Sequence, residues 1–494
     1  MPDIRDITGM CKAGQVQEAY KLAKEGYASD TNSQWAQRAL GWALYYTMKN
    51  DAEHNDYAKM VEHLDELKSL DQLTGAGDSM IFDNVQFQIA MFVKAHIPVT
   101  APDASSRLSA LFHRLKDYQL NPSRGHSFLL QSFIKFEGWE EMADFIDWWN
   151  LDKLLPDDYK PFKTQSGQEI MALAERAFIA YSKALLKHDD TERIKEFLPK
   201  LDNLMTGYPK MMYPGYFYGK LLLKLGSDEE EALKVTIPFA RKKAADFWVW
   251  QLLSDVFAHD PEKQLACLLR AVHCRTQENF LGKVRIKLAT LYIQAGQLDR
   301  AKFHIDAITR CYVSQGWKLP YEVSNWIHQP WINTVAPNGS DPIDYKQITD
   351  RILCDGAEEA VAVVTYIDPK SHRATVVYGQ EQREFCKLPV KAAVGSVLRI
   401  HYVNDATGQF KVLNAIKIAV PDGLPYIKET EGTVNKKENN AYAFLKSTGV
   451  DCFISPDIVR KYSLSDKEHV KALVVYDYNK KKESWTWICI TIKK

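Results

Sequence analysis

Residues 431–459, EGTVNKKENNAYAFLKSTGVDCFISPDIV, hold the pattern that decides the fold of the C-terminal part of the chain. Small and aromatic residues alternate from 441 to 445, and a further aromatic, Phe453, follows after a short turn. Successive side chains of a strand point to opposite faces, so Tyr442 and Phe444 are predicted on one face and the alanines of the same run on the other. The stretch therefore predicts neighbouring strands that present aromatic rings on one side.

This stretch resembles the cold-shock domain, a five-stranded barrel of the OB type that binds single-stranded nucleic acid. The matching segments are, in chain order, Gly432-Thr433-Val434, Ala441 to Leu445, Gly449, Asp451 to Ile454, Ser455-Pro456 and Ile458. The resemblance implies that Tyr442, Phe444 and Phe453 stack on bases. Stacking is worth about 1–3 kcal/mol per base, so three rings imply binding around the micromolar level once ordering costs are subtracted.

Positive charge is predicted where a nucleic-acid backbone would pass. Lysines lie in the loop after the first strand, after the aromatic strand and in the last hairpin loop: Lys436, Lys437, Lys446, Lys480, Lys481 and Lys482. Loops of this kind flank the binding face of OB barrels. These lysines and Ser455 complete the predicted nucleic-acid site around the three rings.

The stretch departs from the cold-shock pattern at two places. Lys436 and Lys437 stand where the family has an exposed aromatic pair, and Ser455 stands where it has a histidine. Two stacking positions and one hydrogen-bond donor are thus altered, which implies weaker binding or a shift toward phosphate contacts. The alternative is a barrel that kept the fold but uses Tyr442 and Phe444 to contact protein.

Strand-like runs also precede this stretch. β-branched and aromatic residues separated by turn clusters occur in Ala360–Tyr366, Ala374–Tyr378, Val397–Val403 and Phe410–Ile418. We therefore predict two closed OB-type barrels, at 356–420 and 426–494, joined by a link at 421–425. In the first barrel the candidate ring and phosphate contacts, for which ordinary core or surface roles are the alternative, are Tyr366, Tyr378, Tyr402, Lys370, Arg373 and Arg383.

Helical periodicity dominates the chain before residue 314. Apolar residues recur at spacings of three and four between short polar turns, as in Trp35–Met48, Glu169–Leu186, Phe247–Phe257, Glu262–Cys274 and Phe280–Ala295. Helices of this length joined by tight turns predict antiparallel pairs stacked as an α-solenoid over residues 1–313.

Part of this helical region resembles the tetratricopeptide repeat, a helical hairpin of about 34 residues. One candidate repeat has Trp250, Leu253, Ser254, Phe257 and Ala266, and the next has Leu288, Ala289, Tyr292, Gly296, Ala301 and Ile305. In this pattern small residues let the two helices approach while the aromatic fills the space beside them. Between residues 50 and 245 the register is not held, so degenerate repeats and another helical arrangement both stay open.

A connector is predicted at 314–355. It contains the helix-breaking residues Pro320, Pro330, Pro337 and Pro342 and the aromatics Trp317, Trp326 and Trp331. Three tryptophans are too many for a free linker, so the connector is expected to pack on a neighbouring domain. A short helix is predicted at Tyr345–Leu353.

Composition limits the class of protein. With 494 residues, 46% hydrophobic and 26% charged, the chain is neither disordered nor a coiled-coil rod. It lacks an apolar run of about 20 residues and a signal-like N-terminus, which predicts a cytoplasmic protein without membrane contact. The 63 basic and 63 acidic residues cancel, yet residues 351–494 carry a net charge of +5 and favour a polyanion partner there.

Catalytic and metal-binding motifs are missing from the sequence. It contains no nucleotide-binding loop, nucleophile elbow or H-E-x-x-H motif, and its eight cysteines form no C-x-x-C pair. Cys267 and Cys274 share a predicted helix face, but His273 is rotated off it, which favours buried thiols over zinc. The sequence therefore predicts a protein that is not an enzyme and needs no cofactor.

These patterns predict a multidomain, non-catalytic adaptor that holds single-stranded RNA or DNA on its barrels and a protein partner on its helices. Groove-lining candidates, with a core role as the alternative, are Trp148, Trp149, Tyr213, Tyr216, Phe217 and Tyr218. The order of domains resembles accessory proteins of bacterial conflict, or phage-defence, systems. The competing hypothesis is a protein–protein scaffold whose barrels have lost nucleic-acid binding.

Overall fold

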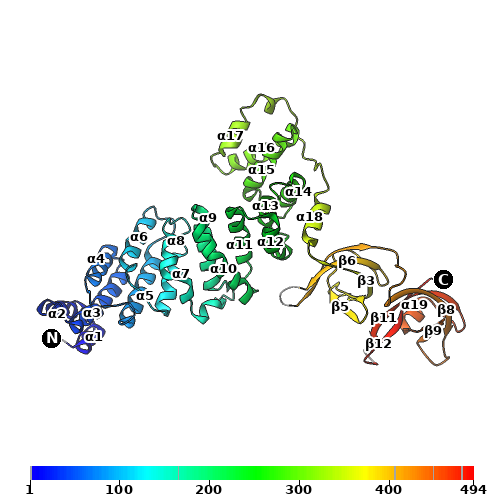
Figure 1. Cartoon of the computed structure of the whole chain (residues 1–494), viewed down its shortest axis with the longest axis horizontal. Coiled ribbons are helices and arrows are strands. Elements are labelled where there is room, and N and C mark those ends of the chain that lie inside the picture. Colours follow the sequence, from blue (N-terminus) through cyan, green and yellow to red (C-terminus); the bar gives the residue numbers. More distant parts are fainter. Residues whose placement is uncertain (1–2, 165, 405–407, 449, 480–481, 494) are drawn as a thin grey trace. The chain divides into compact units, whose positions relative to one another are not determined.

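The structure is a computed structural model that describes residues 3–164, 166–404, 408–448, 450–479 and 482–493 (Figure 1). The chain divides into two compact units, Met1–Ala232 and Leu233–Lys494. The first unit is almost entirely helical, and the second begins with helices and ends in two β assemblies. The predicted order, a helical part followed by a β part, is confirmed.

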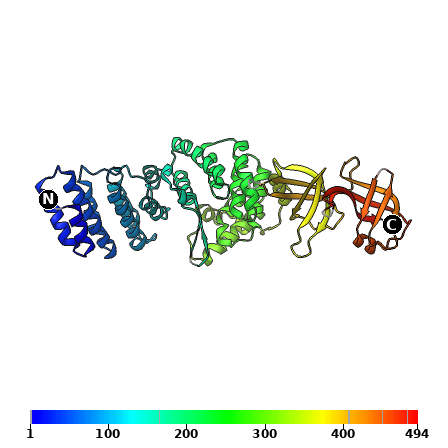
Figure 2. The same cartoon turned by 90° about the horizontal axis from the view of Figure 1, so that it is seen from below.

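Consecutive helices build the first unit. They are α1 (Ile4–Lys12), α2 (Val16–Ser29), α3 (Gln34–Glu53), α4 (Tyr57–Lys68), α5 (Ser79–His96), α6 (Ala104–Leu115), α7 (Arg124–Phe133), α8 (Met142–Trp149), α9 (Leu173–Lys187), α10 (Thr191–Gly207) and α11 (Pro214–Leu225). Their order from blue to green is visible in Figure 2. Contacts join α3 to α5 and α5 to α7, while α4 contacts α6, so the helices form two rows.

One predicted helix of this unit starts later than expected. The helix placed at Glu169–Leu186 begins at Leu173, because Glu169 and Ile170 form the short strand β2. This strand pairs antiparallel with β1 (Phe162–Lys163). The predicted helix started one turn too early, inside the hairpin, because the helical periodicity of the following residues was extended backward.

Close approach of backbones fixes the row of α3, α5 and α7. A Cβ at Gly41 of α3 would lie 3.0 Å from Leu73 and 3.3 Å from Ile81, and one at Gly125 of α7 would collide with Asp83 of α5. Gly125 also donates its N–H to the Asp83 carboxylate at 2.7 Å. Glycine at these two positions therefore lets neighbouring helices pack at short range.

The helices of the second unit pair as hairpins. Helix α12 (Glu229–Lys243) contains the unit boundary and is followed by α13 (Phe247–Val256), α14 (Pro261–Val272), α15 (Gly282–Gln294), α16 (Leu298–Ser314), α17 (Tyr321–Trp326) and α18 (Tyr345–Cys354). Contacts join α13 to α14 and α15 to α16. The small and aromatic positions of the repeat pattern, Trp250, Ala266, Ala289, Tyr292 and Ala301, are all buried. That these hairpins are tetratricopeptide repeats stays a prediction.

The predicted connector contains structure and packs on its neighbour. Val323 of α17 and Ile332 join the buried core between α15 and α16, and Trp326 and Trp331 pack against it. Trp317 lies edge to face with Tyr312, with ring centroids 5.5 Å apart. Trp326 and Trp331 are therefore explained by a satellite core on the last hairpin, whereas Trp317 is 46% exposed.

The first β assembly is an antiparallel sheet of β3 (Glu358–Ile367), β4 (Ala374–Gly379), β5 (Gln382–Cys386), β6 (Val397–Asn404) and β7 (Phe410–Lys417) in the order β5-β4-β3-β6-β7. In the described part of the chain no ladder joins β5 to β7. The two edge strands nevertheless contact each other, and a closed barrel at 356–420 is not confirmed. Sequence periodicity locates strands but does not report whether distant edges meet.

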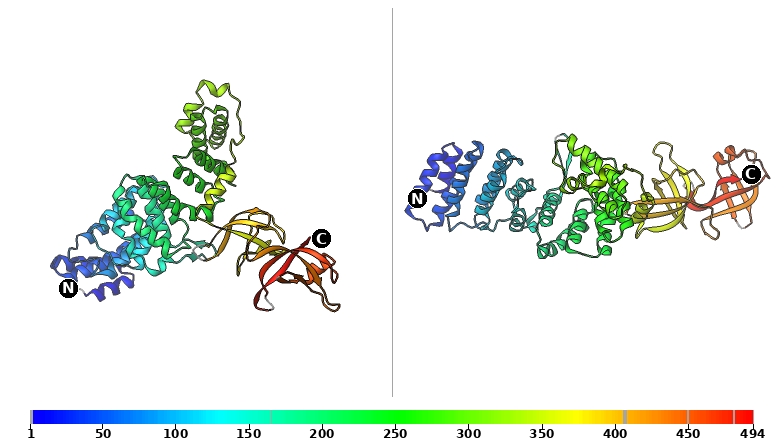
Figure 3. Two further views of the ribbon diagram at one scale, coloured as in Figure 1. Left: turned by 45° about the vertical axis from the view of Figure 1, so that its right-hand side comes forward. Right: turned by 90° about the horizontal axis from the view of Figure 1, so that it is seen from above.

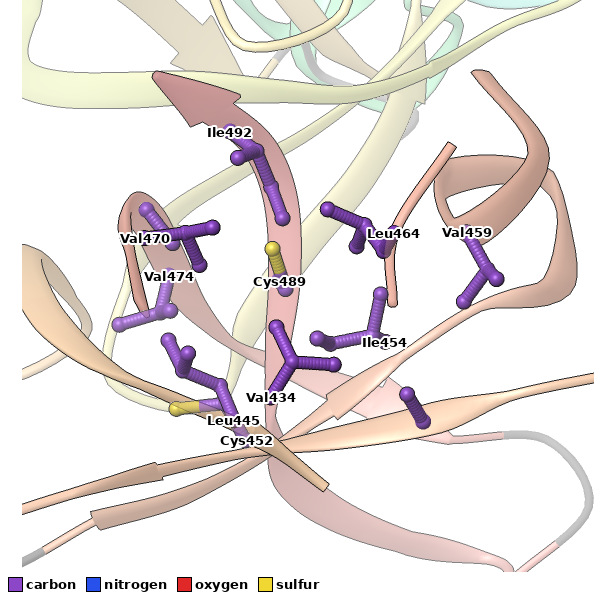
Figure 4. Close-up of a cluster of buried hydrophobic side chains, with 12 residues drawn as sticks. Val434, Leu445, Cys452, Ile454, Val459, Leu464, Val470, Val474, Cys489 and Ile492 are labelled. Atoms are coloured by element: carbon purple, nitrogen blue, oxygen red, sulfur yellow. The ribbon is translucent and has the colours of Figure 1, made fainter. Parts of the chain in front are cut away.

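The second β assembly is a closed barrel. Its strands are β8 (Ile427–Asn435), β9 (Ala443–Ser447), β10 (Val450–Ile454), β11 (His469–Asn479) and β12 (Ser484–Lys493), with α19 (Pro456–Lys461) after β10. The order β10-β12-β11-β8-β9 closes on itself, and only the β10–β12 pair is parallel among the described strands. Its core holds Val434, Leu445, Cys452, Ile454, Val474 and Cys489 (Figure 4). This is a five-stranded barrel of the OB class.

The open sheet and the barrel pack on each other inside the second unit, as the adjoining yellow and red strands of Figure 3 show. Val363, Val377 and Val397 of the sheet share a buried cluster with Val475 and Ile490 of the barrel. The Tyr426 hydroxyl donates to the Val361 carbonyl at 2.8 Å. The segment at 421–425 thus leads into a shared apolar interface and is no flexible link between independent modules.

Gly432 offers a direct test of the barrel. A Cβ at this position of β8 would collide with the carbonyl oxygen of Lys446 on β9. We expect Gly432→Ala to destabilise the barrel by about 1–3 kcal/mol, because the two strands must separate. Hydrogen exchange of the β8 and β9 amides in the full chain measures the effect. As a control, Gly9→Ala in α1, where a Cβ meets nothing within 4 Å, should leave exchange in the barrel unchanged.

Candidate nucleic-acid interface

Three aromatic rings gather on the outside of the barrel at β9 and β10. Phe444 and Phe453 are directly opposite each other in the ladder, with ring centroids 5.9 Å apart. Tyr442, which precedes β9, lies 5.8 Å from each of them and is 38% exposed. Phe444 and Phe453 are half-buried. We call these three side chains the ring cluster.

Burial of the alternate residues holds the ring cluster outward. Ala443, Leu445, Cys452 and Ile454 lie in the barrel core with at most 1% exposure. Because strand side chains alternate, the residues between them must face solvent. Ala441 was predicted on the inward side, but it is exposed and precedes β9, so that detail is wrong. The outward position of the three rings is as predicted.

The three rings are tilted relative to one another. The plane of Tyr442 makes an angle of 89° with that of Phe444 and 41° with that of Phe453. Edge-to-face packing of this kind stabilises the cluster itself. A base could stack on one exposed face at a time, so the geometry offers separate stacking positions instead of one flat platform.

Lys446 forms an ion pair beside the rings. It lies two residues after Phe444, and Asp451 lies two residues before Phe453, so both side chains share the outer face with the ring cluster. Lys446 and Asp451 are paired across the ladder and joined by an ion pair, with 51% and 58% of their side chains exposed. An exposed pair adds at most about 1 kcal/mol to stability, but its carboxylate cancels the positive charge next to the rings.

Of the other predicted lysines, Lys436 is held by contacts within the barrel. Lys436 is half-buried, and its Nζ donates to the Leu464 carbonyl at 3.4 Å, while its backbone N–H donates to Asp466 at 2.9 Å. Lys437 and Lys482 are exposed. Lys480 and Lys481 lie outside the described residues, as does Gly449 of the cold-shock pattern.

Ser455 has a structural position at the end of β10. It is the N-cap of α19, and its Oγ accepts a hydrogen bond from the Ile458 N–H at 3.4 Å. Serine is among the residues preferred at an N-cap because it satisfies one of the unpaired N–H groups of the first turn. This capping role accounts for Ser455 without a ligand.

A second aromatic group on the β11–β12 hairpin was not predicted. Tyr476 is paired with Trp487 and Tyr478 with Trp485, and the Tyr478 and Trp485 ring centroids lie 5.9 Å apart. Lys428 Nζ lies 4.7 Å from the Trp487 ring. All four rings are half-buried. The alternations Tyr-Asp-Tyr and Trp-Thr-Trp were the available signal, since each places two rings on one face.

Most candidates in the first sheet have structural partners. The buried Tyr402 donates to Glu358 at 2.8 Å, and its burial raises its pKa to about 12. Arg373 lies over the Phe385 ring at 4.7 Å and Arg383 pairs with Asp477 at 3.1 Å. Tyr366 is 50% exposed, and Lys370 is also exposed.

The open edge of the first sheet borders a cleft of about 1070 Å³. Apolar lining comes from residues such as Leu388, Phe410 and Val412, and basic residues outnumber the acidic Glu358: Arg241, Lys242, Arg373, Lys387 and Lys411. Arg241 is committed to the carbonyls of Leu353 and Asp355, and Lys411 to that of Arg241. Several of these cations therefore hold the cleft together.

Metal clusters and membrane-spanning helices are both missing from the described residues. No group of three or more His, Cys, Asp or Glu side chains in this part of the chain is placed to hold a metal ion. Over the same residues, every helix is too short or too polar to cross a bilayer.

Comparison with known families assigns the barrel. Residues 428–492, which contain almost all of β8 to β12, match the family described as S1/CSD-like domain 2 of the TOTE conflict systems. Residues 212–351 match the family described as Domain of unknown function (DUF7017). A comparison with curated proteins found no match. The C-terminal barrel is thus similar to an S1/CSD-like domain of conflict systems, which supports both the predicted cold-shock-like character and the link to defence.

The Lys446–Asp451 pair generates a prediction about charge at the ring cluster. Asp451→Asn should free Lys446, tighten binding of a labelled single-stranded oligonucleotide by about two- to fivefold and steepen its salt dependence. Fluorescence anisotropy across salt concentrations measures both effects. The matched control is Asp457→Asn, which removes an equal charge from the exposed pair with Arg460 on α19. Equal effects of the two changes would contradict a local role of Asp451.

Proposed function

We propose that the protein is a non-catalytic nucleic-acid-binding adaptor of a bacterial conflict system. The barrel holds single-stranded RNA or DNA on Tyr442, Phe444 and Phe453, and the helical region binds a protein partner. The observation that carries this proposal is the outward ring cluster on β9 and β10 of a barrel that matches an S1/CSD-like family.

Stacking, more than phosphate binding, supplies the affinity in this proposal. Each stacked base contributes about 1–3 kcal/mol, and the protein has three rings to offer. Lys446 is neutralised by Asp451 and Lys436 is bound to Leu464, so fewer lysines remain for phosphates than the sequence suggests. The salt dependence of binding should therefore be shallow for the barrel alone.

The helical part of the proposal has its own support. Paired helices that bury a small-residue and aromatic pattern, as α13 to α16 do, suit a repeat array, and such arrays present extended surfaces to protein partners. A solenoid of tetratricopeptide-like repeats over 1–313 is part of the proposal.

A scaffold without nucleic acid is the second candidate function. It is favoured by the half-buried state of Phe444 and Phe453 and by the acidic group of Asp451 beside them. A surface of clustered aromatics with paired charges at its edge also suits a protein interface. In that case the ring cluster would contact the partner directly.

Removal of two rings distinguishes the two functions. Tyr442→Ala with Phe444→Ala should weaken binding of labelled single-stranded RNA and DNA to the full chain by about 30-fold or more, because two stacking contacts are lost. The matched control is Tyr321→Ala, which removes an exposed tyrosine from α17, outside the two β assemblies. If the double variant binds as tightly as the unmodified chain, or if neither nucleic acid binds at all, the scaffold function stands instead.

A further inference from the structure

Each helix of one row in the first unit is exposed along a single stripe. On α5 the stripe is Met80, Asn84, Phe87, Met91 and Lys94, at spacings of three and four, and on α3 it is Trp35, Arg38, Trp42, Tyr45 and Lys49. The stripe of α7 is Arg124, Phe128 and Gln131 and continues to Lys135 beyond the helix end, and that of α9 is Arg176, Ile179 and Lys183. We call these residues together the stripe surface.

The stripes are neighbours in space. Contacts join α3 to α5, α5 to α7 and α7 to α9, and Figure 1 shows α3, α5 and α7 following one another. Phe87 and Phe128 meet edge to face with ring centroids 5.3 Å apart, which joins the stripes of α5 and α7. Arg38 pairs with Asp78 at the start of α5 at 2.6 Å. The stripe surface is therefore continuous from α3 to α9.

Large apolar side chains are unusually exposed on this surface. Trp35 is 66% exposed, Met80 67%, Met91 42% and Phe128 44%. Helices that bury their remaining faces in a core seldom keep such residues in water without a partner, since contiguous apolar exposure marks interaction sites. By contrast, the groove candidates Trp149 and Phe217 named from the sequence are buried.

Cations predominate on the stripe surface. Its members include several lysines and arginines, and the acids of the same helices that are not buried are Glu53, at the end of α3, and Asp83 of α5, which accepts the N–H of Gly125. Burial lowers the pKa of Lys135, and the charges of Lys94 and Arg176 lower it further, so both cations act on Lys135. Among the described residues none of the three forms an ion pair, and the buried Nε of Arg176 has no hydrogen-bond partner.

The nearby acids already have other partners. Glu137 pairs with Lys183 at 2.6 Å, and the buried Glu175 accepts the N–H groups of Met212 and Tyr213. Lys94, Lys135 and Arg176 therefore favour an acidic ligand beside the apolar side chains of this surface.

We propose that the stripe surface binds an acidic amphipathic peptide segment of a partner protein. Its apolar side chains pack on Met80, Met91 and Phe128, and its carboxylates pair with Lys94, Lys135 and Arg176. The inference deepens the proposed partner-binding role of the helical region and does not depend on nucleic-acid binding by the barrel.

A peptide fits this surface better than a polynucleotide. Flexible methionines such as Met80 and Met91 adapt to apolar side chains, as in other grooves that accept amphipathic helices. Lys94 lies on α5, Lys135 follows α7 and Arg176 lies on α9. Charge complementarity thus favours a peptide that carries both acidic and apolar side chains.

Selection from a phage-displayed random peptide library on the full chain tests the proposal. Enriched peptides should combine acidic residues with large apolar residues at spacings of three and four. Their synthetic forms should bind Lys94→Glu with Lys135→Glu at least about tenfold more weakly, and Met91→Ala with Phe128→Ala should also weaken binding. The matched control is Lys12→Glu with Lys21→Glu, which changes the same charge on exposed positions of α1 and α2.

The alternative outcomes overturn the proposal. The proposal fails if the unmodified chain enriches no more peptides than the double glutamate variant does, or if the enriched peptides are basic. It also fails if the enriched peptides bind the double glutamate variant and its control with equal affinity. Loss of labelled single-stranded RNA binding on the Lys94 and Lys135 variant, but not on the control, would assign the surface to nucleic acid. Peptide binding should be unchanged in the Tyr442→Ala, Phe444→Ala variant. This measurement separates a failure of the peptide proposal from a failure of nucleic-acid binding by the barrel.

Discussion

The barrel depends on the two-residue alternation of β9 and β10. Leu445 and Cys452 are fully buried in the core, and this burial forces Phe444 and Phe453 to the outside. A shift of either strand by one residue would place the rings in the core and the core residues in water, so core packing fixes the register. The exposed ring cluster is therefore a consequence of the fold, and its exposure costs the barrel little extra.

Short-range patterns allowed much of this fold to be predicted. Strands such as Ala374–Tyr378 and Val397–Val403 were located to within one residue, because β-branched runs bounded by turns are local signals. The outward rings followed from the same alternation. The resemblance of the barrel to a known family was predicted from motif residues. The structure explains why one of them, Gly432, is a glycine: β9 leaves no room for a side chain at that position.

Long-range contacts set the limits of prediction. The ion pair between Lys446 and Asp451 depends on which strands are neighbours, and the turn of Lys436 toward Leu464 depends on a loop after α19. Whether a ladder joins β5 to β7 depends on how far the sheet curls. The stripe surface could not be predicted without knowing how successive helices pack. Each stripe alone has the same residue spacing as a core face, and only the neighbouring helices decide which face is covered.

The ring cluster and the stripe surface suit ligands of different chemistry. The ring cluster has apolar faces and a neutralised edge, so it suits ligands that bring their own flat surfaces. The stripe surface has apolar side chains and uncompensated cations, so it suits ligands that bring carboxylates. Under the proposed function, a barrel with three stacking positions would bind nucleic acid weakly by itself. A partner held by the helices that also contacts the nucleic acid would raise the effective affinity by orders of magnitude without any new contact on the barrel. Weak stacking combined with a separate protein contact therefore favours an adaptor, in which binding is strong only when both ligands are present.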